Sequence, residues 1–156
     1  TIGEGPDAHE WTPPPSPRHE TSYCWDPLYS LSDGEMPTCS NDKATPMLSW
    51  LGHRGTAEWV TYRFDKARTV SWCDVYWTDS KGKNSIQAPQ SWKVSYRVGQ
   101  VWREVTGASG CGVEVDKFNR VTFQPVETTA LRLDVQLRPD RTGGILEWRL
   151  GGPRDL

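Results

Sequence analysis

The sequence has few of the residue patterns that enzyme active sites require. Its three histidines are His9, His19 and His53. No GxSxG segment is present to form the sharp turn that exposes a nucleophilic serine in many hydrolases. Glycine pairs occur near the end of the chain but do not form a phosphate-binding loop. We therefore expect a protein that is not an enzyme.

Long apolar runs and an excess of one charge are also missing. No apolar stretch approaches the roughly 18 residues that a membrane-spanning helix needs. Lys and Arg number 18 and Asp and Glu number 20, which gives a net charge of −2. We expect no membrane span and no nucleic-acid partner, because the latter needs a basic surface. The chain begins at Thr1, which suggests a processed or excised piece whose missing signal peptide says nothing about its destination.

The four cysteines do not form a CxxC pair, so a zinc site is not expected. Two alternatives remain for them, namely buried free thiols or one or two disulfides. If one bridge forms, we expect Cys24–Cys39, because both residues lie in a segment rich in turn-forming residues.

Strand signals, by contrast, are abundant. In the segment 131–137, leucine and valine alternate with polar residues, which places the apolar side chains on one face of a strand. Gly99–Gln100 separates two such runs and predicts a hairpin. No run of ten residues has a helical period. The other expected strands are 57–65, 69–78, 92–98, 101–105, 113–116, 119–125 and 145–150. These runs predict an all-β, antiparallel β-sandwich of about eight strands.

The N-terminal segment has a different composition. Pro13, Pro14, Pro15 and Pro17 favour an extended backbone without strand pairing, so residues 1–20 are expected to be a linker. Residues 21–152 are expected to form one domain.

Oxygen-bearing side chains are concentrated in the turn-rich segment 30–42. Hard cations such as calcium are bound by six to eight oxygens from short bent segments, often with one distant carboxylate. Glu147 stands in a strand-like run near the end of the chain and is such a carboxylate. The alternative is a turn without a metal. The oxygen-bearing residues of the segment include Asp33, Glu35, Thr38, Ser40, Asn41 and Asp42.

Nine tryptophans make the sequence rich in aromatic residues. An aromatic ring in a loop can offer a flat face to a sugar, whereas a ring in a strand usually packs in the core. For each loop tryptophan, packing remains an alternative to ligand contact. The strand residues Trp59, Trp72, Trp92, Trp102 and Trp148 are expected to be structural. Asp74, Glu104 and Asp134 are expected to lie on solvated strand faces.

Three segments together resemble a known superfamily. They are GTAEWVTYRF, VYWTDSKGKNSIQAPQSWKVSYRVGQVWREV and DKFNRVTFQPVETTALRLDVQLRPDRTGGILEWRL. The chain, over about residues 21–150, resembles the galactose-binding-like β-sandwich superfamily of discoidin and the coagulation factor 5/8 C-domains. Within it, the chain is most similar to accessory modules of secreted bacterial glycoside hydrolases of the β-L-arabinofuranosidase type.

The resemblance implies a jelly-roll sandwich without catalytic activity and with one structural calcium ion. In such modules the ion is held by an early Asp-Gly loop and a C-terminal carboxylate, which match Asp33–Gly34 and Glu147 here. Thr38, Asn41 and Asp42 are options for the intermediate ligands.

The function that the resemblance implies is carbohydrate binding. Such a module, secreted or on a bacterial cell surface, would hold an attached glycoside hydrolase near plant or microbial polysaccharide. Two alternatives are a structural domain that packs on a catalytic partner and an adhesion domain for protein or membrane surfaces. From their spacing, the residues expected to contact sugar are Trp25, Trp50, His53, Asn84 and Arg141.

Overall fold

The computed structural model describes residues 19–22, 39, 48–50, 52–82 and 85–153. This part of the chain forms seven strands and contains no helix long and apolar enough to cross a membrane. The strands are β1 (His19–Thr21), β2 (Leu48–Ser49), β3 (Ala57–Trp77), β4 (Ser91–Val98), β5 (Val101–Glu104), β6 (Phe118–Gln136) and β7 (Gly144–Gly151).

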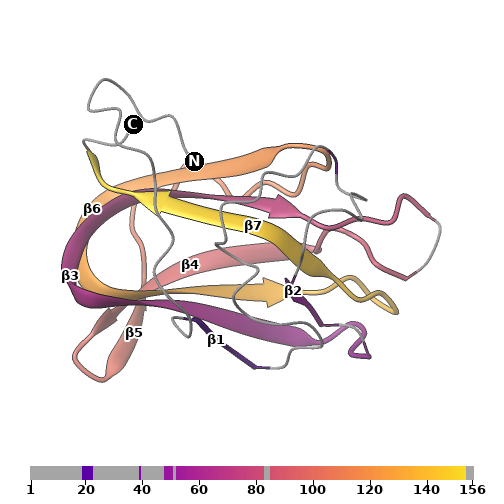
Figure 1. Ribbon diagram of the computed structural model, residues 1–156, viewed down its shortest axis with the longest axis horizontal. Helices are drawn as coiled ribbons and strands as arrows, with labels where there is room; N and C mark the ends of the chain where they lie inside the picture. Colours follow the sequence, from indigo (N-terminus) through magenta and orange to yellow (C-terminus); the bar gives the residue numbers. More distant parts are fainter. Residues whose placement is uncertain (1–18, 23–38, 40–47, 51, 83–84, 154–156) are drawn as a thin grey trace.

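All strand pairs are antiparallel, in the order β2-β7-β3-β6-β4-β5, with β1 also pairing with β3. The long strands β3 and β6 curve together, so that each contributes to two layers (Figure 1). Their halves at 57–63 and 130–136 pair in the layer that also holds β1, β4 and β5. Their other halves pair in the layer that holds β7 and β2. The result is a β-sandwich.

The predicted all-β antiparallel fold is confirmed, with one difference in how the strands divide. The expected strands 57–65 and 69–78 are both parts of β3, because the chain bends through a register shift between Arg63 and Arg68 instead of leaving the sheet. The expected strands 119–125 and 131–137 are likewise parts of one strand, β6, which contains all of their residues except Leu137. Residues 113–116 form no strand.

Two boundaries bear on the local predictions. The hairpin at Gly99–Gln100 is confirmed, since Val98 pairs with Val101 and Gly99 adopts a φ of 62° that favours glycine. At the N-terminus, β1 begins at His19, inside the segment expected to be linker.

The core lies between the two layers and is rich in tryptophan. Trp72, Trp77 and Trp148 are fully buried. Trp148 packs edge-on against Tyr62, with ring centroids 5.7 Å apart, and so joins β7 to the opposite layer. The expectation that Trp72 and Trp148 are structural agrees with this burial. The remaining fully buried large side chains include Trp50, Leu48, Leu131, Leu133, Leu137, Ile145 and Leu146.

The expectation of a solvated Asp74 is wrong. Asp74 is only 2% exposed, and its carboxylate accepts hydrogen bonds from the guanidinium groups of Arg120 and Arg149. Each arginine also lies over an aromatic ring, Arg120 over Trp72 at 3.8 Å and Arg149 over Phe118 at 3.7 Å. The two arginines therefore cover the carboxylate and compensate for its removal from water.

Candidate functional site

Three loops meet at one end of the sandwich. They are residues 50–56, 78–90 and 137–143, and the last of them, the turn between β6 and β7, is bonded to both of the others. The joining backbone hydrogen bonds are Trp50 N to Gly143 O (2.9 Å), Gly55 N to Arg141 O (2.9 Å), Gln87 N to Thr142 O (3.0 Å) and Thr142 N to Ser85 O (2.9 Å). The loop end is therefore a connected surface.

Trp50 anchors the first of these loops. Its side chain is fully buried, and its indole Nε1 donates a hydrogen bond to Thr21 Oγ1 at 3.2 Å. Its carbonyl oxygen accepts hydrogen bonds from the His53 amide and the Thr142 hydroxyl, both at 2.9 Å. The ring faces the protein interior in this arrangement, so a sugar contact by Trp50 stays a prediction that would require the ring to be uncovered.

Two other predicted contact residues, His53 and Arg141, come together at this end. The hydrogen bond from Gly55 N to Arg141 O places their loops side by side. The His53 side chain is 40% exposed and Arg141 is partly exposed. Trp25 and Asn84 lie outside the described residues, so their predicted roles stay predictions.

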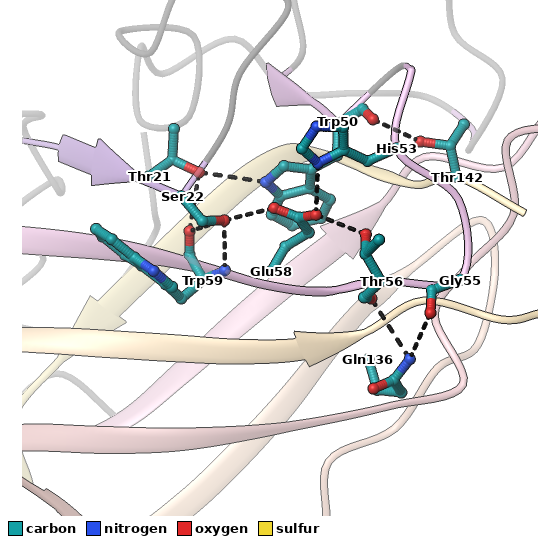
Figure 2. A network of polar contacts seen from close by, with 10 residues as sticks. All are labelled: Thr21, Ser22, Trp50, His53, Gly55, Thr56, Glu58, Trp59, Gln136 and Thr142. Atoms are coloured by element: carbon teal, nitrogen blue, oxygen red, sulfur yellow. Dashed lines mark hydrogen bonds and ion pairs between the residues drawn. The ribbon is translucent and has the colours of Figure 1, made fainter.

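The residue that organises His53 is Glu58, which the sequence analysis did not select. Glu58 is the second residue of β3 and lies on the inward face of the strand, where it is only 4% exposed. Its Oε2 lies 2.8 Å from His53 Nδ1 and accepts a 2.5 Å hydrogen bond from the Thr56 hydroxyl. Its Oε1 accepts a 2.6 Å hydrogen bond from the Ser22 hydroxyl, as Figure 2 shows. The carboxylate thus joins β1, the 50–56 loop and β3.

The charge of Glu58 depends on these donors. Burial raises the pKa of the Glu58 carboxyl, but the hydrogen bonds from Ser22, Thr56 and His53 and the nearby His53 charge outweigh burial. The net pKa is lowered, so the group is ionised at neutral pH. An ionised carboxylate fixes the orientation of the imidazole ring at the rim of the loop end. The sequence did contain a signal for the burial of Glu58. It stands two and four residues before Val60 and Tyr62, so strand alternation places its carboxylate on the same inward face.

Beside this network, the strand ends form an open hollow of about 380 Å³. Gln136 closes one side, and its amide nitrogen donates hydrogen bonds to the carbonyls of Gly55 (3.2 Å), Thr56 (3.4 Å) and Leu137 (3.0 Å). The lining is mixed polar and apolar: Ala57, Glu58, Ser91, Trp92, Lys93, Asp134, Val135 and Gln136. Such a lining suits a ligand with many hydroxyl groups.

Of the predicted metal ligands, the structure describes only Glu147. It is fully buried in β7, opposite Tyr76 of β3. Asp33, Thr38 and Asn41 lie outside the described residues, and among the described ones no three His, Cys, Asp or Glu side chains cluster. A buried carboxylate has the donor chemistry that calcium prefers. Glu147 therefore fits the predicted ion, which stays a prediction.

Cys73 and Cys111 do not have the character of reactive cysteines. Cys73 is buried, and burial raises its pKa above the ordinary value. Cys111 is partly buried, and mainly this burial raises its pKa to about 11. Both are free and protonated at neutral pH, so they are poor nucleophiles. The predicted Cys24–Cys39 bridge involves Cys24, which lies outside the described residues.

Comparison with known proteins gives similarity in structure only. No family model matches the sequence, and no curated protein matches it. Several solved structures do match in fold. One comes from work on the Streptococcus pneumoniae beta-galactosidase BgaA, with a TM-score of 0.74, 18% identity, and coverage of 96% of this chain and 96% of that chain.

Two further structures are isolated modules. The family 32 carbohydrate-binding module of C. perfringens NanJ, solved in complex with galactose, has a TM-score of 0.62 and 15% identity, and the match covers 85% of this chain and 90% of that chain. Chitosan-binding module 1 from the chitosanase/glucanase of Paenibacillus sp. IK-5 has a TM-score of 0.61 and 15% identity, with coverage of 86% and 93%.

These similarities confirm the expected fold. The chain shares the β-sandwich fold of these solved structures, and the match extends over most of its length. At identities this low, the shared fold does not carry the ligand with it. The function must be argued from the residues at the loop end.

Proposed function

We propose that the protein is a non-catalytic carbohydrate-binding module that contacts sugar at its loop end. The observation that carries the proposal is the pairing of His53 with the buried Glu58 carboxylate where three loops converge, in a loop whose backbone is hydrogen-bonded to that of Arg141. The shared fold with modules that are described as galactose-bound and chitosan-binding supports it.

The chemistry of these residues suits sugar hydroxyl groups. An imidazole held by Glu58 presents a directed polar group, and a guanidinium presents several donors in one plane. Trp25 and Asn84 would complete the site as a stacking ring and an amide. A shallow, hydrated site of this kind gives modest affinity, because few contacts are fully removed from water.

The same proposal extends to the protein's surroundings. We place the domain in a secreted or cell-surface bacterial protein, attached to a glycoside hydrolase and directing it to plant or microbial polysaccharide. Modest affinity is sufficient for that task, because attachment raises the local concentration of the enzyme at the polysaccharide.

The loop-end site is tested by replacing its two described polar residues. His53→Ala and Arg141→Ala are each expected to weaken binding about tenfold, which corresponds to the loss of one or two hydrogen bonds. A glycan array first identifies the ligand, and titration calorimetry then measures the affinity of each variant. Arg103→Ala, on β5, is the matched control and should bind like the original protein.

Thermal melts show whether each variant is folded. Folded His53→Ala and Arg141→Ala proteins with unchanged affinity would rule out the loop-end site. A folded original protein that binds no glycan would favour the structural accessory role.

That role calls for a large exposed apolar patch. The large apolar side chains exposed in the described part are three valines, Val98, Val101 and Val115.

We also propose that the domain binds one structural calcium ion through Glu147, with Asp33, Thr38 and Asn41 as the predicted further ligands. The ion would supply a countercharge to a carboxylate that is fully removed from water. It would thereby connect β7 to the segment before β2.

Calcium removal should therefore lower thermal stability. An ion present at about 100 times its Kd stabilises by about 2.7 kcal/mol, and each kcal/mol corresponds to about 2–4 °C in Tm at this size. Melts in calcium and in chelator should differ accordingly for the original protein and for Glu127→Gln, which changes an exposed carboxylate. Glu147→Gln should lose the difference. Identical melts of the original protein with and without calcium would refute the site.

A further inference from the structure

The outer face of the β1-β3-β6-β4-β5 layer has an aromatic cluster that the loop-end site does not use. Trp59 and Trp102 are both partly exposed there, unlike the fully buried tryptophans of the core. The guanidinium of Arg132 lies over both rings, 4.8 Å from the Trp59 centroid and 5.9 Å from the Trp102 centroid. The Trp59 ring points away from the Glu58 carboxylate (Figure 2). This cluster is therefore separate from the His53 network.

A hollow of about 200 Å³ lies at this cluster, and its charge is unbalanced. Its lining contains three arginines and one glutamate: Glu20, Trp59, Thr61, Arg63, Arg97, Gln100, Trp102, Ala130 and Arg132. Arg63 pairs with Glu20 at 3.1 Å. Arg132 pairs with Asp134 at 3.0 Å. Among the described residues, the lining of the hollow thus carries more positive than negative charge.

Arg97 accounts for the excess of positive charge in the described lining of the hollow, since the other two arginines are paired with carboxylates. Its guanidinium donates to two neutral oxygens, the Gly99 carbonyl at 2.9 Å and the Gln100 side chain at 3.1 Å. Both acceptors lie in the β4–β5 turn, so Arg97 is held at the edge of the hollow next to Trp102, its partner across the strand pair. A guanidinium in this position suits a carboxylate ligand, which would supply the missing negative charge.

The same face continues to the hollow at the strand ends. In register, Trp59 lies opposite Asp134, and Asp134 lies opposite Lys93, which lines that second hollow. The Arg132–Asp134 ion pair stands between the two hollows. The seven residues of β6 from Ala130 to Gln136 span about 20 Å, because they are separated by six steps along the strand. A ligand that uses both hollows must therefore be an extended chain.

We propose that this sheet face is a second saccharide-binding site, and that it takes an extended oligosaccharide of acidic, carboxylate-bearing sugars. Trp59 and Trp102 contribute partly exposed aromatic rings, which in sugar sites pack against sugar C–H groups, and the Arg132 guanidinium that lies over both rings adds hydrogen-bond donors. Arg97 binds a sugar carboxylate, and Lys93 extends the positive charge toward the other end. The site goes beyond the loop-end function. The two sites are neighbours at the strand-end hollow, which Glu58 also lines, but Arg97 and Trp102 belong to the second site alone.

The test uses the full chain and hexamers of galacturonic acid and of glucuronic acid, with the carboxyl-reduced neutral hexamers as comparison. Calorimetry at low salt should show at least one acidic hexamer binding about tenfold more tightly than its neutral form. Added salt should weaken that preference, because the attraction is between exposed charges. Failure of both acidic hexamers to bind more tightly than the neutral ones overturns the proposal.

Variants then locate the site. Arg97→Gln and Trp102→Ala should each weaken binding of the acidic hexamer about tenfold. Arg103→Gln is the control, because alternation places this exposed arginine on the other side of β5. His53→Ala should leave this affinity unchanged, which separates the two sites. If Trp102→Ala does not fold, the affinity of Arg97→Gln for the acidic hexamer is sufficient to test the site. Unchanged affinity of a folded Arg97→Gln protein, or a loss in His53→Ala instead, overturns the proposal.

Discussion

Trp50→Ala is expected to lower the free energy of unfolding by about 3–5 kcal/mol. The Trp50 side chain is fully buried, so its removal leaves a cavity that the surrounding strands cannot fill completely. The change also removes the hydrogen bond from Nε1 to Thr21, and with it a link between β1 and the loop end. Urea denaturation, followed by circular dichroism, measures the change.

A comparison with Trp102→Ala separates burial from residue type. Trp102 is partly exposed on the edge strand β5, so its replacement should cost clearly less than that of Trp50. A Trp50→Ala protein as stable as the original, but with weaker glycan binding, would contradict the structural role. It would instead support the ligand contact that was predicted from the loop position of Trp50.

The first half of β3 could be predicted well because the alternation in its sequence matches the two faces of the strand. Arg63 is exposed and Trp59 partly exposed on one side of the strand, while Val60 and Tyr62 are buried on the other, as the pattern indicates. Thr61 lies on the side of Trp59 and Arg63 but is itself buried. The bend of β3 could not be predicted. Its polar residues between Arg63 and Arg68 have the composition of a loop, and only pairing with the equally bent β6 shows that the strand continues.

The site was predicted in part, for a related physical reason. His53 and Arg141 were selected as polar residues in loops, and the fold brings these loops together. Loop residues have no period that indicates burial, so nothing near Trp50 in the sequence showed that its ring is enclosed. Conversely, Trp59 was assigned to the core because it lies in a strand. Its phase with Thr61 and Arg63 was the available sign that it faces outward.

Asp74→Ala is expected to be the most disruptive change on the opposite layer, with a loss of about 3 kcal/mol in the free energy of unfolding. The aspartate is 2% exposed and is the shared acceptor for Arg120 and Arg149. Without it, Arg149, whose side chain is only 14% exposed, keeps its charge over the Phe118 ring but loses the carboxylate that accepts its hydrogen bonds. Arg120 is 38% exposed and can turn toward water, so we place the loss at the lower end of the range for broken buried pairs.

Asp134→Ala is the matched control, because Asp134 also pairs with an arginine but is 28% exposed. Ion pairs in contact with solvent contribute about 1 kcal/mol or less, so this change should be mild. Equal losses in the two variants, measured by urea denaturation, would mean that burial does not strengthen the Asp74 pair. A further Arg149→Met change in the Asp74→Ala protein should recover part of the lost stability, because it removes the uncompensated charge and keeps an apolar side chain against Phe118. Recovery would show that the stability loss in Asp74→Ala comes mainly from the uncompensated Arg149 charge. The role of Asp74 would then be to neutralise the two arginines that surround it.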